Sequence, residues 1–270
     1  MSPTNGENAS PGHPNPGRPE HFGRPGHRRA SHEKFVARRL VEALSEAVTD
    51  TDPQRSLARL CRACVELLDV SGASISLSGG EQARTTWWSS DEVAGRLAES
   101  QYSLGDGPCQ RAVALAAPVL ASDLSQGQDA RRWPAFAQEA VALGVRAVYS
   151  LPLGSEAVVI GTLDLYREES GLLEGGELRH GLMASDAITY ALLHFHSLLG
   201  GGGPGEVASW LEGAEEGHDE VHQATGMLMY LLRLDPQQAL ARLRAHAYVH
   251  GQSVSAAARD VIERKVSFDE

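Results

Sequence analysis

Three cysteines and a glycine turn are the residues whose types and spacing could do covalent chemistry or bind phosphate. Cys61 and Cys64 have the spacing of a redox pair. Cys109 follows Gly107-Pro108 at a predicted helix start, a position that can activate a thiol. Cys61 and Cys64, however, fall well inside a predicted helix and on its apolar side. We therefore expect Cys61 and Cys64 to be buried small hydrophobic residues, while redox activity at any of the three cysteines stays open.

Other signatures of enzymes are weak in this sequence. Gly105-x-Gly107 resembles part of a phosphate-binding loop, but no Gly-Lys-Ser/Thr follows it, which favours a simple turn. No carboxylate pair, Ser-His-Asp set or kinase motif is recognisable. The cysteines have no further metal ligands at short spacing. We therefore expect no catalytic residues, no metal site and no enzymatic activity, with chemistry at Cys109 as an alternative. The sequence identifies no cofactor.

The overall composition is that of an acidic globular protein. Among 270 residues, 35 are acidic and 24 are basic, which gives a formal net charge of -11. The hydrophobic fraction of 42% is enough for a packed core. No run approaches the roughly 18 apolar residues that span a bilayer, and the first thirty residues contain no secretory signal. The odd number of cysteines favours a reducing compartment, so we expect a cytoplasmic protein with no membrane partner.

Composition also divides the chain into segments. Residues 1–30 are rich in Pro, Gly, Asn, His and Arg and are expected to form a disordered tail. Residues 200–205 read Gly-Gly-Gly-Gly-Pro-Gly, which no regular element tolerates, and they are expected to form a mobile hinge. These segments delimit one predicted domain at 31–199 and a second at 206–270.

The first predicted domain has an α+β pattern. A helix is expected from Ser31, and a second one from Asp52-Pro53, an N-cap followed by the favoured proline position. The alternation of apolar residues and serines over 73–78 predicts a half-buried strand with a hairpin partner at 82–88. Further strands are expected at 118–121, 145–153 and 158–166, and further helices at 107–116, 133–143 and 177–199. One antiparallel sheet flanked by helices accounts for this pattern.

The second predicted domain is entirely helical. The helices are expected from Val221, after Asp235-Pro236, and from Ser253 or Ser255. Their apolar faces hold Leu243 and other residues at helical spacing: Val221, Ala224, Leu228, Leu231, Leu232, Ala239, Leu240, Ala247, Val254, Ala257, Ala258, Val261 and Ile262. Three short helices are marginal alone, so these faces must pack on one another or on a second copy.

The helical tail resembles a known family. Residues 221–262 read V-H-Q-A-T-G-M-L-M, then A-L-A-R-L-R-A-H-A, then V-S-A-A-A-R-D-V-I. This resembles the ANTAR domain of bacterial transcription antitermination regulators. The resemblance implies a three-helix bundle that binds paired hairpin loops in nascent mRNA, so that the terminator hairpin cannot form. Because two hairpins call for two bundles, it also implies a homodimer. Thr225 stands where many family members have lysine.

Residues from about 35 to 199 resemble a GAF domain. The resemblance rests on short fragments: Gly105-Asp106-Gly107-Pro108-Cys109, Pro118-Val119, Asp123-Leu124, Arg132-Trp133-Pro134, Leu151-Pro152-Leu153 and Ile160–Tyr166. Their order, followed by the ANTAR-like tail, is similar to actinobacterial GAF-ANTAR regulators. The resemblance implies a small-molecule or protein signal at the GAF domain. The alternative is a GAF protein that senses a ligand or redox state and whose tail is only a dimerisation module.

The candidate RNA-binding residues lie in the tail. Residues 218–270 carry six basic and seven acidic side chains, so shape and base contacts must contribute to affinity beside phosphate contacts. Arg244 is the first choice, because its neighbour Leu243 takes the apolar face and Arg244 is turned about 100° toward solvent. Tyr248 and His250 could stack an unpaired base or cover the bundle core. The predicted set is Ala224, Thr225, Gly226, Arg244, Tyr248, His250 and Arg259.

Overall fold

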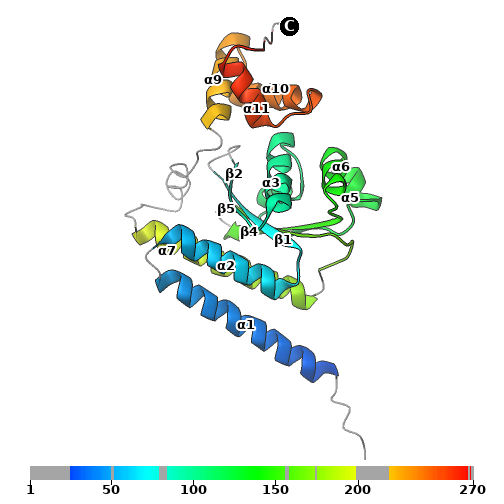
Figure 1. The fold of residues 1–270 in the computed structure, drawn as a ribbon, viewed down its shortest axis with the longest axis vertical. Helices are drawn as coiled ribbons and strands as arrows, with labels where there is room; N and C mark the ends of the chain where they lie inside the picture. Colours follow the sequence, from blue (N-terminus) through cyan, green and yellow to red (C-terminus); the bar gives the residue numbers. More distant parts are fainter. Residues whose placement is uncertain are drawn as a thin grey trace, which may run out of the picture.

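The first domain is built on a five-stranded antiparallel sheet with the strand order β2-β1-β5-β4-β3 (Figure 1). The structure is a computed structural model, and it describes residues 25–49, 52–78, 84–155, 158–173, 175–198, 219–266 and 268. The strands are β1 (Gly72–Ser78), β2 (Arg84–Ser89), β3 (Val119–Ala121), β4 (Ala147–Gly154) and β5 (Val159–Arg167). The strands expected from the sequence are all present, within a few residues of their predicted bounds.

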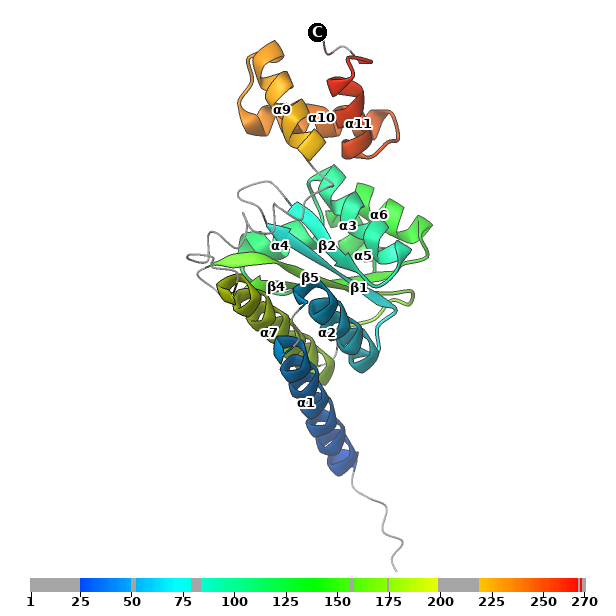
Figure 2. The same cartoon turned by 60° about the vertical axis from the view of Figure 1, so that its left-hand side comes forward.

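Helices cover both faces of this sheet (Figure 2). One face packs against α2 (Pro53–Leu68) and α7 (Gly175–Leu198), and α1 (Pro25–Thr49) packs on these two helices. The other face carries α3 (Glu92–Leu104), α4 (Pro108–Leu115), α5 (Gly127–Arg132) and α6 (Pro134–Ala142). The expected α+β class, an antiparallel sheet flanked by helices, is therefore confirmed.

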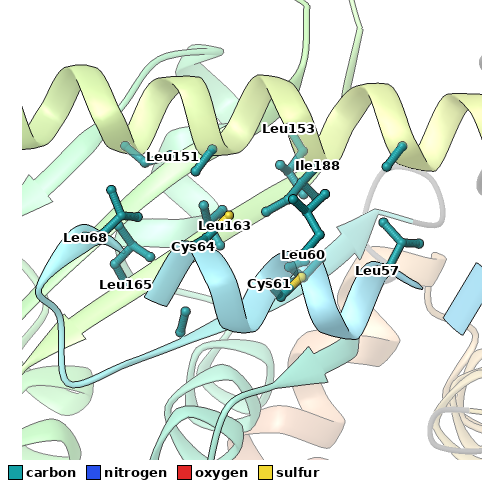
Figure 3. Close-up of a cluster of buried hydrophobic side chains, with 14 of the residues drawn as sticks. Leu57, Leu60, Cys61, Cys64, Leu68, Leu151, Leu153, Leu163, Leu165 and Ile188 are labelled. Carbon is teal, nitrogen blue, oxygen red and sulfur yellow. The ribbon is translucent and has the colours of Figure 1, made fainter. Parts of the chain in front are cut away.

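The larger core lies between the sheet and the two helices α2 and α7, and it extends to the side of α1 that packs on these helices. Figure 3 shows the apolar side of α2 facing leucines of β4 and β5 and Ile188 of α7. Cys61 and Cys64 lie in this cluster, and both are 0% exposed. The expectation that they are buried small hydrophobic residues is confirmed.

The two-sided cover corrects the prediction for β1. The serines of this strand were expected on a solvated face, but Ser74 and Ser76 are buried. The strand lies between β2 and β5 in the sheet, and helices cover both faces. Alternation of small polar and apolar residues therefore marks here a strand whose polar side meets α3 rather than water.

Two helix starts can be compared with their predictions. Asp52 caps α2 as expected, and its side chain accepts a hydrogen bond from the Arg55 backbone N at 3.2 Å. The first helix, however, begins at Pro25 rather than at Ser31, because proline suits the first helical turn and no further proline interrupts the segment. Residues 25–30 are therefore helical. The remainder of the predicted tail, and the hinge at 200–205, lie outside the described residues.

Two helices, α3 and the short α5, were not predicted from the sequence. Asp91 caps α3, and its carboxylate accepts hydrogen bonds from the Ala94 backbone N at 2.9 Å and from the Tyr166 hydroxyl at 3.0 Å. The second bond ties the start of α3 to β5. The helix ends at Gly105, whose φ of 65° is the left-handed conformation that glycine adopts without strain.

The second domain is a bundle of α9 (Asp219–Leu232), α10 (Pro236–Val249) and α11 (Val254–Ile262), hereafter called the bundle. Its helices enclose one core, in which Leu228, Leu243 and Ala258 are fully buried. Asp235 and Ser253 cap α10 and α11 as their positions before the helices suggest. Leu231 is an exception to the predicted core, because it is 65% exposed near the end of α9. Within the described residues, no helix combines the length and apolar character needed to cross a membrane.

Candidate nucleic-acid interface

The bundle is seated on the last turn of α3. Both views place it at the end of that helix, and α10 and α11 contact α3 (Figures 1 and 2). Tyr102 of α3 is only 4% exposed, and its ring packs into the same hydrophobic cluster as the bundle core. A helix that was not predicted from the sequence therefore connects the two domains.

Arg244 is the centre of this contact. Its guanidinium carbon lies 5.5 Å from the centroid of the Tyr102 ring, a cation–π arrangement. The Arg244 Nε is buried without a hydrogen-bond partner, and burial lowers the pKa of the guanidinium. A Cβ added at Gly105 would lie 2.6 Å from Arg244 Nη1, so this glycine leaves room for the side chain. The sequence prediction that Arg244 points to solvent is wrong, because it considered α10 alone and α3 covers that side.

A hydrogen bond joins the start of α11 to the same turn of α3. The Val254 backbone N, one of the unpaired donors at a helix N-terminus, donates to Ser103 Oγ at 3.1 Å. Ser103 Oγ in turn donates to Glu99 Oε1 at 3.2 Å. An open cleft of about 540 Å³ lies beside this contact, between α3, α6 and the turn that joins α10 to α11. Tyr248 lines the cleft and is 58% exposed.

The other predicted aromatic residue has a local partner. The ring of His250 lies 4.1 Å from that of His246, and His250 Nδ1 is 2.9 Å from the His246 carbonyl oxygen. His246 also lies against Phe268. Burial, together with the nearby His250, lowers the pKa of His246. Neither Tyr248 nor His250 is among the buried residues of the bundle core.

The three predicted residues of α9 differ in what they can offer a ligand. Ala224 is 0% exposed in the bundle core, so the prediction that its side chain contacts RNA is wrong. Thr225 Oγ1 donates to the Val221 carbonyl oxygen at 2.7 Å, so this hydroxyl serves the helix backbone. Gly226 is exposed, and a Cβ placed there would meet nothing within 4 Å. Only Gly226 presents an open surface.

The remaining predicted residue, Arg259, pairs within the bundle. Its Nε lies 3.2 Å from Glu220 Oε2, which joins α11 to the start of α9. The predicted set therefore does not form one cluster: Arg244 and Tyr248 lie toward α3, while Arg259 and Gly226 lie elsewhere. Tyr102 was not predicted from the sequence, although an N-cap at Asp91 and the helical spacing after it could have placed this residue on a helix.

The features considered for catalysis lie at buried or turn positions of this fold. Burial raises the pKa of the Cys64 thiol to about 12 and that of Cys61 well above its usual value. Cys109 is 3% exposed, and its backbone N donates to Gln101 Oε1 at 2.8 Å. Gly107 has a φ of 142° before α4, which agrees with the turn interpretation. Among the described residues, no group of three His, Cys, Asp or Glu side chains could hold a metal ion.

Comparison with known proteins identifies both domains. The model of the ANTAR domain matches residues 210–262, and the model of a GAF domain matches residues 50–179. No curated protein matches the chain. Residues 50–179 thus match a GAF domain and residues 210–262 match an ANTAR domain, and this combination supports a regulator of the signal-transduction kind.

Solved structures of similar fold are distant in sequence. The GAF domain of a phosphoenolpyruvate-protein phosphotransferase from Coxiella burnetii is 12% identical, with a TM-score of 0.49 over 63% of this chain and 98% of that one. Free methionine-R-sulfoxide reductase from Neisseria meningitidis, in complex with its substrate, is 14% identical, with a TM-score of 0.48 over 62% of this chain and 93% of that one.

Proposed function

We propose that this chain is a GAF-ANTAR transcription antitermination regulator of the actinobacterial type, which binds hairpin loops of nascent mRNA through its bundle. The observation that carries the proposal is the ANTAR match over 210–262, which spans a segment whose described helices close around a core of their own. While the protein holds these hairpins, the RNA would not form the terminator hairpin, so transcription would continue. The chain would act as a homodimer, one bundle for each hairpin, and in the cytoplasm, where nascent mRNA is available.

Docking of the bundle on α3 supports a route from the GAF domain to RNA. The helix packs against β1, β2 and β5 on one side and against α10 and α11 on the other. A small molecule or protein that shifts α3 would therefore change the position of the Arg244 guanidinium on the Tyr102 ring. Since the guanidinium binds phosphate or guanine once it is free, the docked arrangement would be the less active one.

The proposal assigns no enzymatic activity to the chain. A nucleophilic or redox cysteine acts as the thiolate, and burial raises the pKa of the Cys61 and Cys64 thiols. Cys109 is buried at the start of α4, which supports a packing role. Iodoacetamide labelling of the folded chain at pH 7.5 tests this assignment: slow reaction at all three cysteines is expected, and rapid reaction at Cys109 would favour the enzyme alternative.

RNA binding by the full chain is the direct test of the function. Fluorescence anisotropy would compare an RNA with two hairpins and unpaired loops with a continuous duplex of the same base pairs. We expect at least about tenfold tighter binding of the hairpin RNA, because sequence-specific RNA recognition relies on unpaired loop bases. Light scattering should give two chains for each RNA. Equal or absent binding of both RNAs by a dimeric chain would instead support a dimerisation module.

A further inference from the structure

The outward side of α9 carries the most exposed large hydrophobic side chain among the described residues. Tyr230 is 86% exposed, on the side of α9 opposite the buried Val221 and Leu228. Gln223 and Gly226 precede it by seven and four residues, so they share this side of the helix. Arg233 is exposed directly beyond the helix end. These four residues, Gln223, Gly226, Tyr230 and Arg233, are hereafter called the free face.

The free face has room for a planar group beside the tyrosine ring. A Cβ at Gly226 would meet nothing within 4 Å, so the helix backbone is open there. Gly226 lies about 4.5 Å along the helix axis from Gln223 and about 6 Å from Tyr230. A flat group resting over Gly226 would therefore have an amide at one edge and an aromatic ring at the other.

The charges of the bundle argue for a base as the occupant. Residues 218–270 carry a formal charge of -1, and several of the cations are already engaged. Arg244 lies on Tyr102, Arg259 pairs with Glu220, and Lys265 lies near Asp260 and Glu263. Attraction to phosphate is therefore small, and binding of a polyanion to this domain needs a contribution that does not depend on charge. Stacking of a base on an aromatic ring supplies such a contribution.

The other aromatic candidates are less suited to this role. Tyr248 lines the cleft beside α3, and the His250 ring lies against His246. Tyr230 is 86% exposed against 58% for Tyr248, and the open backbone at Gly226 lies one helical turn before it on the same side of α9.

We propose that the free face of α9 binds one unpaired nucleotide of an RNA loop. Its base stacks on Tyr230 over Gly226, the Gln223 amide bonds an edge of the base, and Arg233 contacts the neighbouring phosphate. This inference rests on the proposed function and adds the surface and the nucleotide that it recognises. Because α3 leaves this side of the bundle open, the site is available while Arg244 is docked.

The test measures the affinity of the full chain for the two-hairpin RNA with variants at two positions. Tyr230→Ala should weaken binding about 5- to 100-fold, the range expected for loss of one stacked base. Tyr230→Phe should stay within about twofold, since phenylalanine keeps the ring. Gly226→Leu should leave thermal stability unchanged or raised, because its Cβ has open space and leucine is a better helix former, yet it should also weaken binding. Tyr190→Ala, at a 58% exposed tyrosine of α7, is the matched control.

A fluorescent adenine analogue in each loop position supplies a second readout. The wild-type chain should quench it at one position, and Tyr230→Ala should remove that quenching. If the wild-type chain binds the RNA and both Tyr230→Ala and Gly226→Leu retain its affinity, the inference is wrong while the proposed function stands. If these variants instead abolish dimerisation, the free face is an interface between two copies. If the wild-type chain binds no structured RNA, both the inference and the proposed function are overturned.

Discussion

The bundle has two sides that differ in whether another domain covers their polar and aromatic side chains. On one side, which we call the docked face, Arg244, Tyr248 and Val254 lie against or beside α3. On the free face of α9, Tyr230 is largely in water. The docked face is thus held by another domain, whereas the free face is available without any rearrangement.

This difference shows how a charged side chain can be partly buried on an aromatic ring while one of its nitrogens has no hydrogen-bond partner. Arg244 has an aromatic ring beneath it, but its buried Nε has no hydrogen-bond partner. Taking a charge out of water is costly unless it is paired, so the contact gains less than its close packing suggests. The free face carries no such cost. We therefore expect docking to be reversible and the bundle core to be the more stable feature.

The largest effect is expected from Leu243→Asp, which removes the support of both faces at once. Leu243 is 0% exposed, and an unpaired carboxylate there should cost several kcal/mol, comparable with the whole stability of so small a domain. The helical circular dichroism from the bundle should be lost, while the GAF domain keeps its own melting transition. Leu231→Asp, at a position that is 65% exposed, makes the same chemical change and should be nearly neutral. Similar melting of the two variants would show that the core assignment is wrong.

A smaller but more selective effect is expected from Tyr102→Ala, which should break the docked face alone. Truncating a buried aromatic side chain costs on the order of 3 kcal/mol, and here the loss falls partly on the contact with the bundle. Amide hydrogen exchange at Val254 should become faster because its donor loses the nearby Ser103 acceptor. The affinity of the full chain for hairpin RNA should rise as Arg244 becomes free. Unchanged exchange at Val254 would mean that Tyr102 does not hold the bundle.

The sequence predicted the elements that have strong local signals. Asp52 and Asp235 each precede a proline and start a helix, and both cap their helices in the structure. The apolar periodicity of the bundle placed Leu243 and its neighbours in a core, as found. The predicted start of α1 was wrong, because proline and glycine near residue 25 were taken as signs of disorder. A helix tolerates proline in its first turn, and α1 begins at Pro25.

The candidate site was predicted less well, for a physical reason. Helical periodicity tells which residues face the core of their own element, and it placed Arg244 correctly relative to Leu243. It contains no information on a second helix that is distant in sequence, and α3 was itself overlooked. The Arg244 side chain lies against Tyr102 and Gly105. The sequence pattern therefore could not connect these two residues with Arg244. The exposure of Tyr230 was likewise decided by which side of the bundle α3 covers.

A moderate effect is expected from Ser103→Ala, which removes one hydrogen bond of the docked face and keeps the Tyr102 ring. Loss of the Ser103 acceptor leaves the Val254 N–H without its partner, which costs about 0.5–1.5 kcal/mol. Exchange at Val254 should accelerate less than in Tyr102→Ala, and the RNA affinity should change less. Ser45→Ala on the exposed side of α1 is a control of the same chemistry. A larger effect from Ser103→Ala than from Tyr102→Ala would reverse the order of these contacts.

The smallest effect is expected on the pH dependence of bundle stability, through His246 of α10. Burial, with a contribution from His250, lowers the pKa of His246 in the folded chain below the value of about 6.5 that is typical of unfolded chains. The folded state therefore binds a proton less readily than the unfolded state, so stability is full above about pH 6.5 and falls as the pH drops toward the folded pKa. The melting temperature of the bundle should decrease slightly between pH 7.5 and 5.5, and His246→Gln should reduce that decrease. His222→Gln, at an exposed position of α9, should leave the decrease as it is, and an identical pH dependence in all three proteins would show that His246 does not cause it.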